Sequence, residues 1–167
     1  MHVLRTHANP EKGLAVRYQG CCGLACCMYL VGIRKFTRTK LEKFRKFCRE
    51  NSLVSKRGEQ WTGETMETER MKILKFLNVT VKRIPVQSLK LNYNTLGEFI
   101  CKRDIFESSN TYLVTVTEHC LLIKANGKRE SLFGIDQREI RMTYGCEELK
   151  RDWKLELESI WIVKNKV

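Results

Sequence analysis

The residues best equipped for chemistry are a cysteine and a histidine that lie far apart in the sequence. Cys22 stands at the start of the apolar run 23–33, and a thiol at a helix N-terminus feels the positive end of the helix dipole, which favours the thiolate. His119 begins a predicted strand, whereas His2 and His7 lie near the start of the chain. A thiol with an imidazole in hydrogen-bond reach attacks carbonyl carbon, and N–H groups at a helix start hold the oxyanion. This pair predicts nucleophilic acyl transfer.

The strand pairing in a predicted hairpin indicates which residue is the third member of this site. Asn126-Gly127 separates two apolar runs, and this dipeptide favours a two-residue turn. With these two residues alone in the turn, His119 lies opposite Gly134, and Asp136 is its diagonal neighbour on the same face. We therefore expect Asp136 to orient the imidazole.

Other residues compete with Asp136 for this role. Glu130 faces the same side as His119 but lies further along the strand, so it is the second candidate. Side chains alternate between the two faces of a sheet, so a turn one residue longer or shorter reverses the faces. In that case the candidate is Ser131 or Gln137.

The elements that must position these residues follow from hydrophobic periodicity. A helix is predicted to begin near Thr37 or Thr39, and a second helix carries Met66, Ile73, Leu74 and Leu77 on its apolar stripe. Further strands are predicted over 79–84, 112–117, 119–125, 129–135, 139–143 and 159–164, and short helices near 96–100 and 147–153. Helices precede an antiparallel sheet. This order predicts an α+β fold in one domain over 1–167, with the N-terminal helices packed on the C-terminal sheet.

A family resemblance supports the catalytic interpretation. Cys22-Gly23-x-Ala25-Cys26 resembles the nucleophile motif of papain-like cysteine peptidases, closest to the branch that cleaves bacteriocin leader peptides after a double glycine. In that family the histidine starts an apolar strand, as His119 does here, and an aspartate follows on the next strand, as Asp136 does. The region 19–153 follows the family's motifs in order. The resemblance implies a papain-like fold, a protein or peptide substrate, and no metal or organic cofactor.

The resemblance leaves the register and the reaction open. The nearest amide before the nucleophile is Gln19, which would donate to the oxyanion together with the N–H of Cys22. In a second register, 19–25 resembles the papain motif itself, the nucleophile falls at Ala25, and the protein is inactive. The same triad also serves a protein-glutamine deamidase or an acyltransferase, because it attacks a side-chain amide equally well.

The charge suggests an alternative function. Lys and Arg number 31 against 19 Asp and Glu, for a net charge of +12, and the densest positive segment is 34–57. On the predicted helix, Leu41, Phe44, Phe47 and Cys48 form the apolar stripe and the lysines face solvent. The predicted basic face comprises Lys35, Arg38, Lys43, Lys46 and Arg49. Such a face attracts nucleic acid or an acidic protein, so the alternative is an inactive basic binding module.

The cysteines and the apolar runs indicate in which cellular compartment the protein is expected. Residues 1–15 contain no signal-type apolar run, and 23–33 is shorter than the ~20 residues of a membrane span. We therefore expect a cytoplasmic protein that does not enter the membrane, with its eight cysteines mostly reduced. A zinc site from Cys21, Cys22, Cys26 and a distant ligand is a weaker alternative, because the common C-x2-C spacing is missing.

Overall fold

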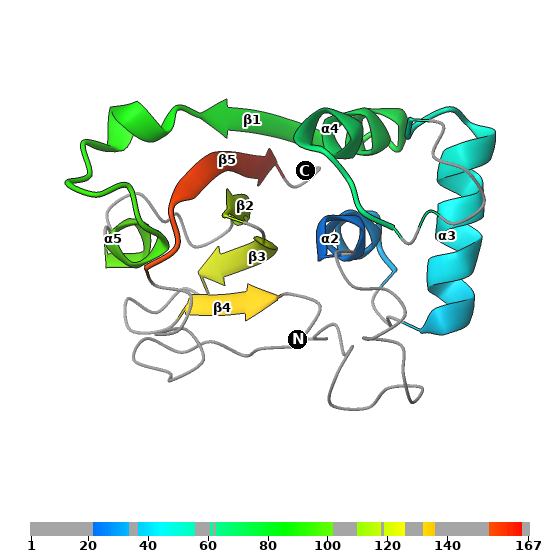
Figure 1. The fold of residues 1–167 in the computed structure, drawn as a ribbon, viewed down its shortest axis with the longest axis horizontal. Helices are drawn as coiled ribbons and strands as arrows, with labels where there is room; N and C mark the ends of the chain where they lie inside the picture. Colours follow the sequence, from blue (N-terminus) through cyan, green and yellow to red (C-terminus); the bar gives the residue numbers. More distant parts are fainter. Residues whose placement is uncertain are drawn as a thin grey trace. The chain divides into compact units, whose positions relative to one another are not determined.

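The protein has an α+β fold (Figure 1), and the chain divides into two compact units. The computed structural model describes residues 22–33, 37–55, 61, 63–101, 110–117, 119–125, 132–135 and 154–164. Unit 1 comprises Met1–Val79 with Asp136–Glu139, and unit 2 comprises Thr80–Ile135 with Ile140–Val167. The single domain over 1–167 stays a prediction. No helix in the described ranges is long and apolar enough to cross a bilayer.

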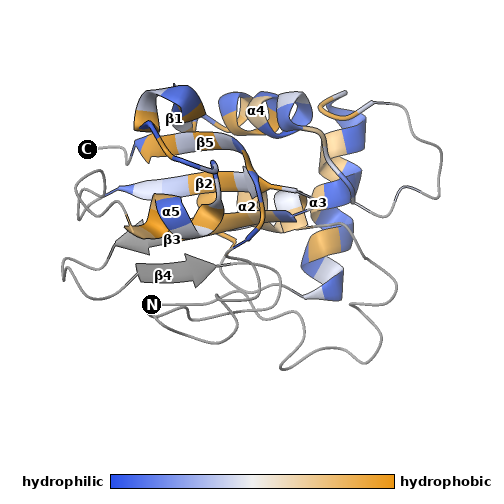
Figure 2. Ribbon diagram, turned by 60° about the vertical axis from the view of Figure 1, so that its left-hand side comes forward, coloured by the Kyte–Doolittle hydropathy of each residue, from blue (hydrophilic) through white to orange (hydrophobic). Residues whose placement is uncertain are grey.

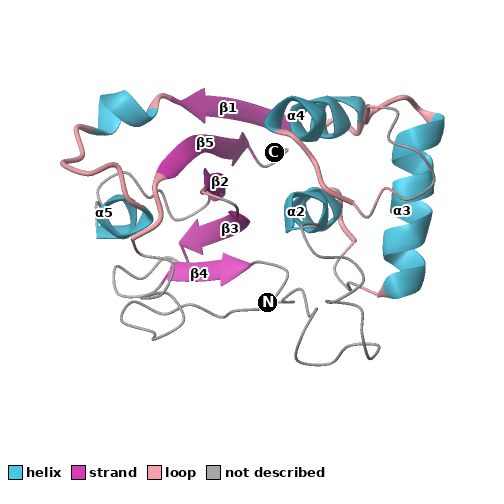
Figure 3. Ribbon diagram, viewed as in Figure 1, coloured by secondary structure: helices cyan, strands magenta, loops and turns pink. Residues whose placement is uncertain are grey.

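The described part of unit 1 is helical. It contains α2 (Cys22–Leu30), α3 (Arg38–Glu50) and α4 (Glu67–Phe76). In Figure 3, α2 is seen nearly end-on and α3 runs from the top to the bottom of the view. α2 is buried from its first residue through Met28, as expected for a helix that is apolar on all sides.

Helix α3 begins where its sequence predicts. The hydroxyl of Thr37, the N-cap, accepts a hydrogen bond of 3.3 Å from the N–H of Lys40, which satisfies one of the helix's unpaired donors. The predicted stripe is confirmed for Leu41, Phe44 and Cys48, which are buried, whereas Phe47 is half-buried. Figure 2 shows apolar and polar residues alternating along this helix. α3 is therefore amphipathic.

Helix α4 departs from its prediction at both ends, and Leu77 is its half-buried C-cap. Ile73 and Leu74 are buried as expected. Met66, by contrast, is the N-cap of the helix and is 53% exposed. Its assignment to the buried stripe was wrong, because the helix begins one residue later and Met66 has extended backbone.

Unit 2 is an antiparallel sheet with one short α-helix. The order of its five described strands is β1-β5-β2-β3-β4, and every neighbouring pair is antiparallel. The elements are β1 (Thr80–Ile84), the 3-10 helix η1 (Val86–Leu89), α5 (Leu96–Cys101), β2 (Thr111–Val116), β3 (His119–Ala125), β4 (Leu132–Ile135) and β5 (Leu157–Lys164). These bounds confirm the predicted strands over the residues that the structure describes. The first part of one predicted strand, 129–131, the predicted strand 139–143 and the predicted helix 147–153 lie outside the described residues.

One face of this sheet packs on α5. Phe99 of α5 meets Tyr112 of β2 edge-to-face, with 6.1 Å between ring centroids, and both side chains are buried. The core around them also contains Leu89, Leu96, Ile100, Val114, Val116, Leu121, Ile123, Leu157 and Ile160. This apolar layer holds the short helix on the sheet, since six residues have little helical stability of their own.

The pairing of β3 with β4 corrects the predicted hairpin. Gly134 pairs with Ile123, not with His119, and Ala125 pairs with Leu132. Residues 126–131 therefore lie between the two strands, instead of Asn126 and Gly127 alone. The predicted two-residue turn was wrong, because the turn preference of Asn126-Gly127 does not fix the register in which the two strands pair.

Candidate functional site

Cys22 is the first residue of α2 and differs from the other thiols of that helix. Its exposed fraction is 8%, whereas Cys26 and Cys27 are 0% exposed. The first N–H groups of a helix have no acceptor within the helix. The thiol of Cys22 therefore belongs to the residue beside these backbone donors, and Cys22 is the least buried of the three cysteines of α2.

The segment before α4 packs tightly on the first turn of α2. A Cβ atom at Gly23 would lie 2.5 Å from Thr65 Oγ1 and 2.8 Å from Arg70 Cδ. Both distances are well below van der Waals contact. Only glycine permits this close approach beside Cys22.

Buried charged side chains hold that segment in place. Arg70 Nη1 donates to the carbonyl oxygen of Thr65 at 2.6 Å and lies 3.4 Å from its hydroxyl. Glu69 accepts hydrogen bonds from the N–H of Met66 at 2.9 Å and of Ser55 at 2.6 Å. Neither residue was predicted from the sequence, although Arg70 lies three and four residues before the buried Ile73 and Leu74, a spacing that places it on the same stripe.

A second contact ties α3 to the same part of unit 1. The guanidinium carbon of Arg45 lies 5.5 Å from the ring centroid of Trp61, a cation–π contact. Arg45 also donates to Glu42 at 3.0 Å, and the indole N–H of Trp61 donates to the carbonyl oxygen of Glu64 at 2.7 Å. Arg45 and Trp61 are buried. This arginine therefore faces inward, away from the exposed cations of α3.

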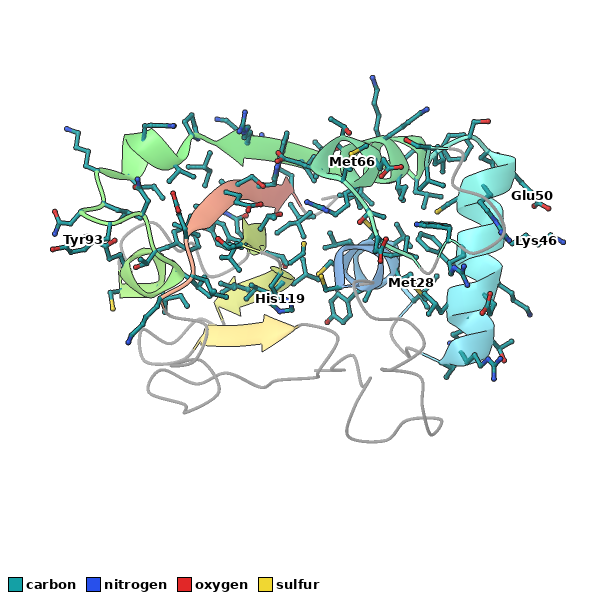
Figure 4. The ribbon with its side chains drawn as sticks, viewed as in Figure 1. Met28, Lys46, Glu50, Met66, Tyr93 and His119 are labelled. Atoms are coloured by element: carbon teal, nitrogen blue, oxygen red, sulfur yellow. The ribbon has the colours of Figure 1, made fainter. Side chains whose placement is uncertain are left out.

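His119 is the first residue of β3 in unit 2, where it pairs with Val116 of β2 (Figure 4). Its side chain is half-buried. The next residue, Cys120, is buried, and its sulfur lies 3.9 Å from the hydroxyl of Thr115. Since side chains alternate along a strand, His119 and Cys120 lie on opposite faces of the sheet.

The predicted catalytic residues divide between described and undescribed parts of the chain. Cys22 belongs to unit 1 and His119 to unit 2, and each is described within its own unit. Asp136, Glu130 and Gln19 lie outside the described residues. The described strand β4 ends at Ile135, so the choice of Asp136 over Glu130, Ser131 or Gln137 stays a prediction.

The predicted basic face is exposed. Arg38, Lys43, Lys46 and Arg49 all face solvent, and Lys35 lies outside the described residues. Lys46 forms an exposed ion pair of 3.6 Å with Glu50, and Figure 4 shows both pointing away from the other helices of unit 1.

The described cysteines do not form a disulfide scaffold. Cys22, Cys26, Cys27, Cys48, Cys101 and Cys120 are all thiols. Burial raises the pKa of the Cys48 thiol to about 12, so it stays protonated at neutral pH. In the described ranges no group of three or more His, Cys, Asp or Glu side chains could hold a metal ion.

The described geometry thus offers a helix-start thiol in unit 1 and a strand-start imidazole in unit 2. Thr65 and Arg70 pack on Gly23, the residue that follows the candidate nucleophile. No protein-family model matches this sequence, and neither the curated proteins nor the solved structures contain a match.

Proposed function

We propose that this protein is a cysteine hydrolase with a papain-like fold that cleaves a peptide or isopeptide bond in a protein or peptide substrate. The observation that carries the proposal is the position of Cys22 at the first residue of α2, where its exposed fraction is 8% against 0% for Cys26 and Cys27. A nucleophile must be reachable by its substrate, and the helix start supplies N–H groups for the oxyanion.

Each residue has a stated role in the proposed reaction. His119 takes the proton of the Cys22 thiol as sulfur attacks the carbonyl carbon, and then gives it to the leaving amine. Water, activated by the same imidazole, hydrolyses the resulting thioester and restores the thiol. Asp136 orients the imidazole. The N–H of Cys22 and the amide of Gln19 stabilise the oxyanion.

Two further observations support this assignment. The chain runs from helices into an antiparallel sheet, the order that the resemblance to papain-like peptidases requires. His119 occupies the first position of a strand, as the catalytic histidine does in that family. We further propose that the enzyme acts in the cytoplasm without a cofactor, where a reduced thiol persists.

Thiol alkylation read peptide by peptide tests the proposal. Cys101 is exposed and serves as an internal reference thiol in the same digest. We expect iodoacetamide to modify Cys22 faster than Cys101 near pH 6.5, although Cys22 is more buried, because His119 activates it.

Two variants complete this experiment. His119→Ala should slow the modification of Cys22 at least tenfold and leave that of Cys101 unchanged. Cys26→Ala, which removes a buried thiol one helical turn away, should change neither rate. The proposal fails if Cys22 reacts no faster than Cys101, or if His119→Ala has no effect on Cys22.

A further inference from the structure

An exposed aromatic side chain lies between α3 and α4 in unit 1. Phe76, at the end of α4, is 50% exposed. Its ring meets that of Phe47 on α3 at 5.8 Å between centroids and 64° between planes. Phe47 in turn stacks on the buried Phe44, with 6.0 Å between centroids. A ring braced in this way presents a fixed apolar surface to solvent.

Lysines flank this aromatic pair on both helices. Lys43 lies one turn before Phe47, and Lys72 lies one turn before Phe76, so each shares a helix face with its aromatic neighbour. Both lysines are exposed. Lys72 Nζ donates to the carbonyl oxygen of Ser52 at 2.7 Å, which holds this ammonium close to the end of α3.

Further cations extend the charge along the two helices. Arg38, Lys40, Lys46, Arg49 and Lys75 are exposed as well. The acidic residue nearest in sequence to Phe47, Glu50, is engaged by Lys46. Arg45, by contrast, is turned inward onto Trp61 and does not contribute to this surface.

We propose that the surface formed by Phe76, Phe47, Lys43 and Lys72 binds single-stranded nucleic acid. A half-exposed ring beside lysines is the arrangement that single strands require, because a base stacks on the ring while the cations contact successive phosphates. An acidic protein would use only the cations. A duplex keeps its bases stacked on each other, so the ring face would be unused. This activity goes beyond the proposed hydrolase function and does not depend on it.

Fluorescence anisotropy with a labelled single-stranded oligonucleotide of about 20 nucleotides tests the proposal. Phe76→Ala should weaken binding about tenfold, and Phe76→Tyr, which keeps the ring, should bind like the wild type. Reversing both charges in Lys43→Glu/Lys72→Glu should weaken binding more at low salt. It should also reduce the slope of log affinity against log salt by about 1.4, at ~0.7 per lost phosphate contact.

Matched controls come from unit 2. Lys82→Glu/Arg83→Glu makes the same charge change at exposed residues of β1, and Tyr93→Ala removes a ring that is 80% exposed. Both should retain wild-type affinity, and so should Cys22→Ala, which separates this proposal from the hydrolase. The proposal is overturned if Phe76→Ala binds the oligonucleotide as tightly as the wild type, or if a duplex binds as tightly as the single strand. It is also overturned if the unit 2 charge variant loses as much affinity as the unit 1 charge variant. Displacement of the oligonucleotide by a poly-glutamate peptide at equal charge concentration would overturn it as well.

Discussion

The two units bury different kinds of polar side chain. Among the described residues, unit 1 buries the charged side chains of Arg45, Glu69 and Arg70, whereas unit 2 buries only the neutral Thr111 and Ser159. The difference follows from the backbone. Strands satisfy one another's N–H and C=O groups in a ladder, whereas the described connections between the helices of unit 1 take hydrogen-bond partners from side chains.

This comparison shows where each unit is sensitive to change. Unit 2 depends on the apolar layer between α5 and the sheet. Unit 1 depends in addition on a few charged hydrogen bonds, which fix the segment beside the candidate nucleophile. Four measurements test the contrast.

The largest effect is expected in the apolar layer of unit 2. Phe99→Ala removes a fully buried ring that contacts Tyr112, and we expect it to lower the free energy of unfolding by about 3–5 kcal/mol. Tyr93→Ala is the control, because that exposed ring should contribute less than ~0.5 kcal/mol. Urea denaturation followed by circular dichroism measures both. Equal effects from the two variants would contradict the assignment of the core.

The buried polar groups of the two units should respond in opposite directions. Arg70→Met leaves the carbonyl of Thr65 without its charged donor, and we expect a loss of about 2 kcal/mol in unfolding free energy. In the described part of the chain, the buried hydroxyl of Ser159 has no hydrogen-bond partner, so Ser159→Ala should be neutral or stabilise by up to ~1 kcal/mol. The contrast breaks down if Ser159→Ala costs as much as Arg70→Met.

Alkaline pH should affect unit 1 through Cys48. Burial raises the pKa of this thiol from 9.0 to about 12, so its contribution to stability is complete below pH 9 and is lost as the pH rises toward 12. Cys48→Ala should cost about 1 kcal/mol at pH 7. That difference from the wild type should shrink by up to ~1.4 kcal/mol per pH unit above pH 9. Urea denaturation at pH 7, 9 and 10 measures it, and a constant difference would refute the expectation.

Acid should produce the smallest effect, in unit 2. Desolvation raises the pKa of Glu98. Hydrogen bonds to its carboxylate have the larger combined effect and lower the pKa below 4.5; they come from the N–H groups of Tyr93, Thr95 and Asn92 and from the Thr95 hydroxyl. The contribution of this carboxylate is therefore present above pH 4.5 and is lost as the pH falls through the lowered value. Glu98→Gln should be less stable than the wild type at pH 7, and thermal denaturation should show the gap closing toward pH 3.

Thr95→Ala checks this assignment. It removes one of the donors to the carboxylate, so its pH-dependent gap should be smaller than that of Glu98→Gln but of the same sign. A gap that widened in acid would mean that another group is responsible.

Much of the local structure could be predicted from the sequence. Thr37 and the stripe of Leu41, Phe44 and Cys48 mark α3 correctly, because capping and periodicity are properties of neighbouring residues. The connection between β3 and β4 could not be predicted, since the turn preference of Asn126-Gly127 competes with pairing along two whole strands. Burial of Arg45 was also missed, because it depends on Trp61, which lies sixteen residues further along the chain.

The sequence alone determined the order of elements, the excess of positive charge and the place of Cys22 at a helix start, since all three depend on residues close together in the chain. Only the tertiary structure decided which groups of unit 1 surround that helix start. Thr65 and Arg70 reach Gly23 through packing, and Phe76 is braced by Phe47 from another helix. Contacts between distant segments depend on how whole elements pack, which no local pattern encodes.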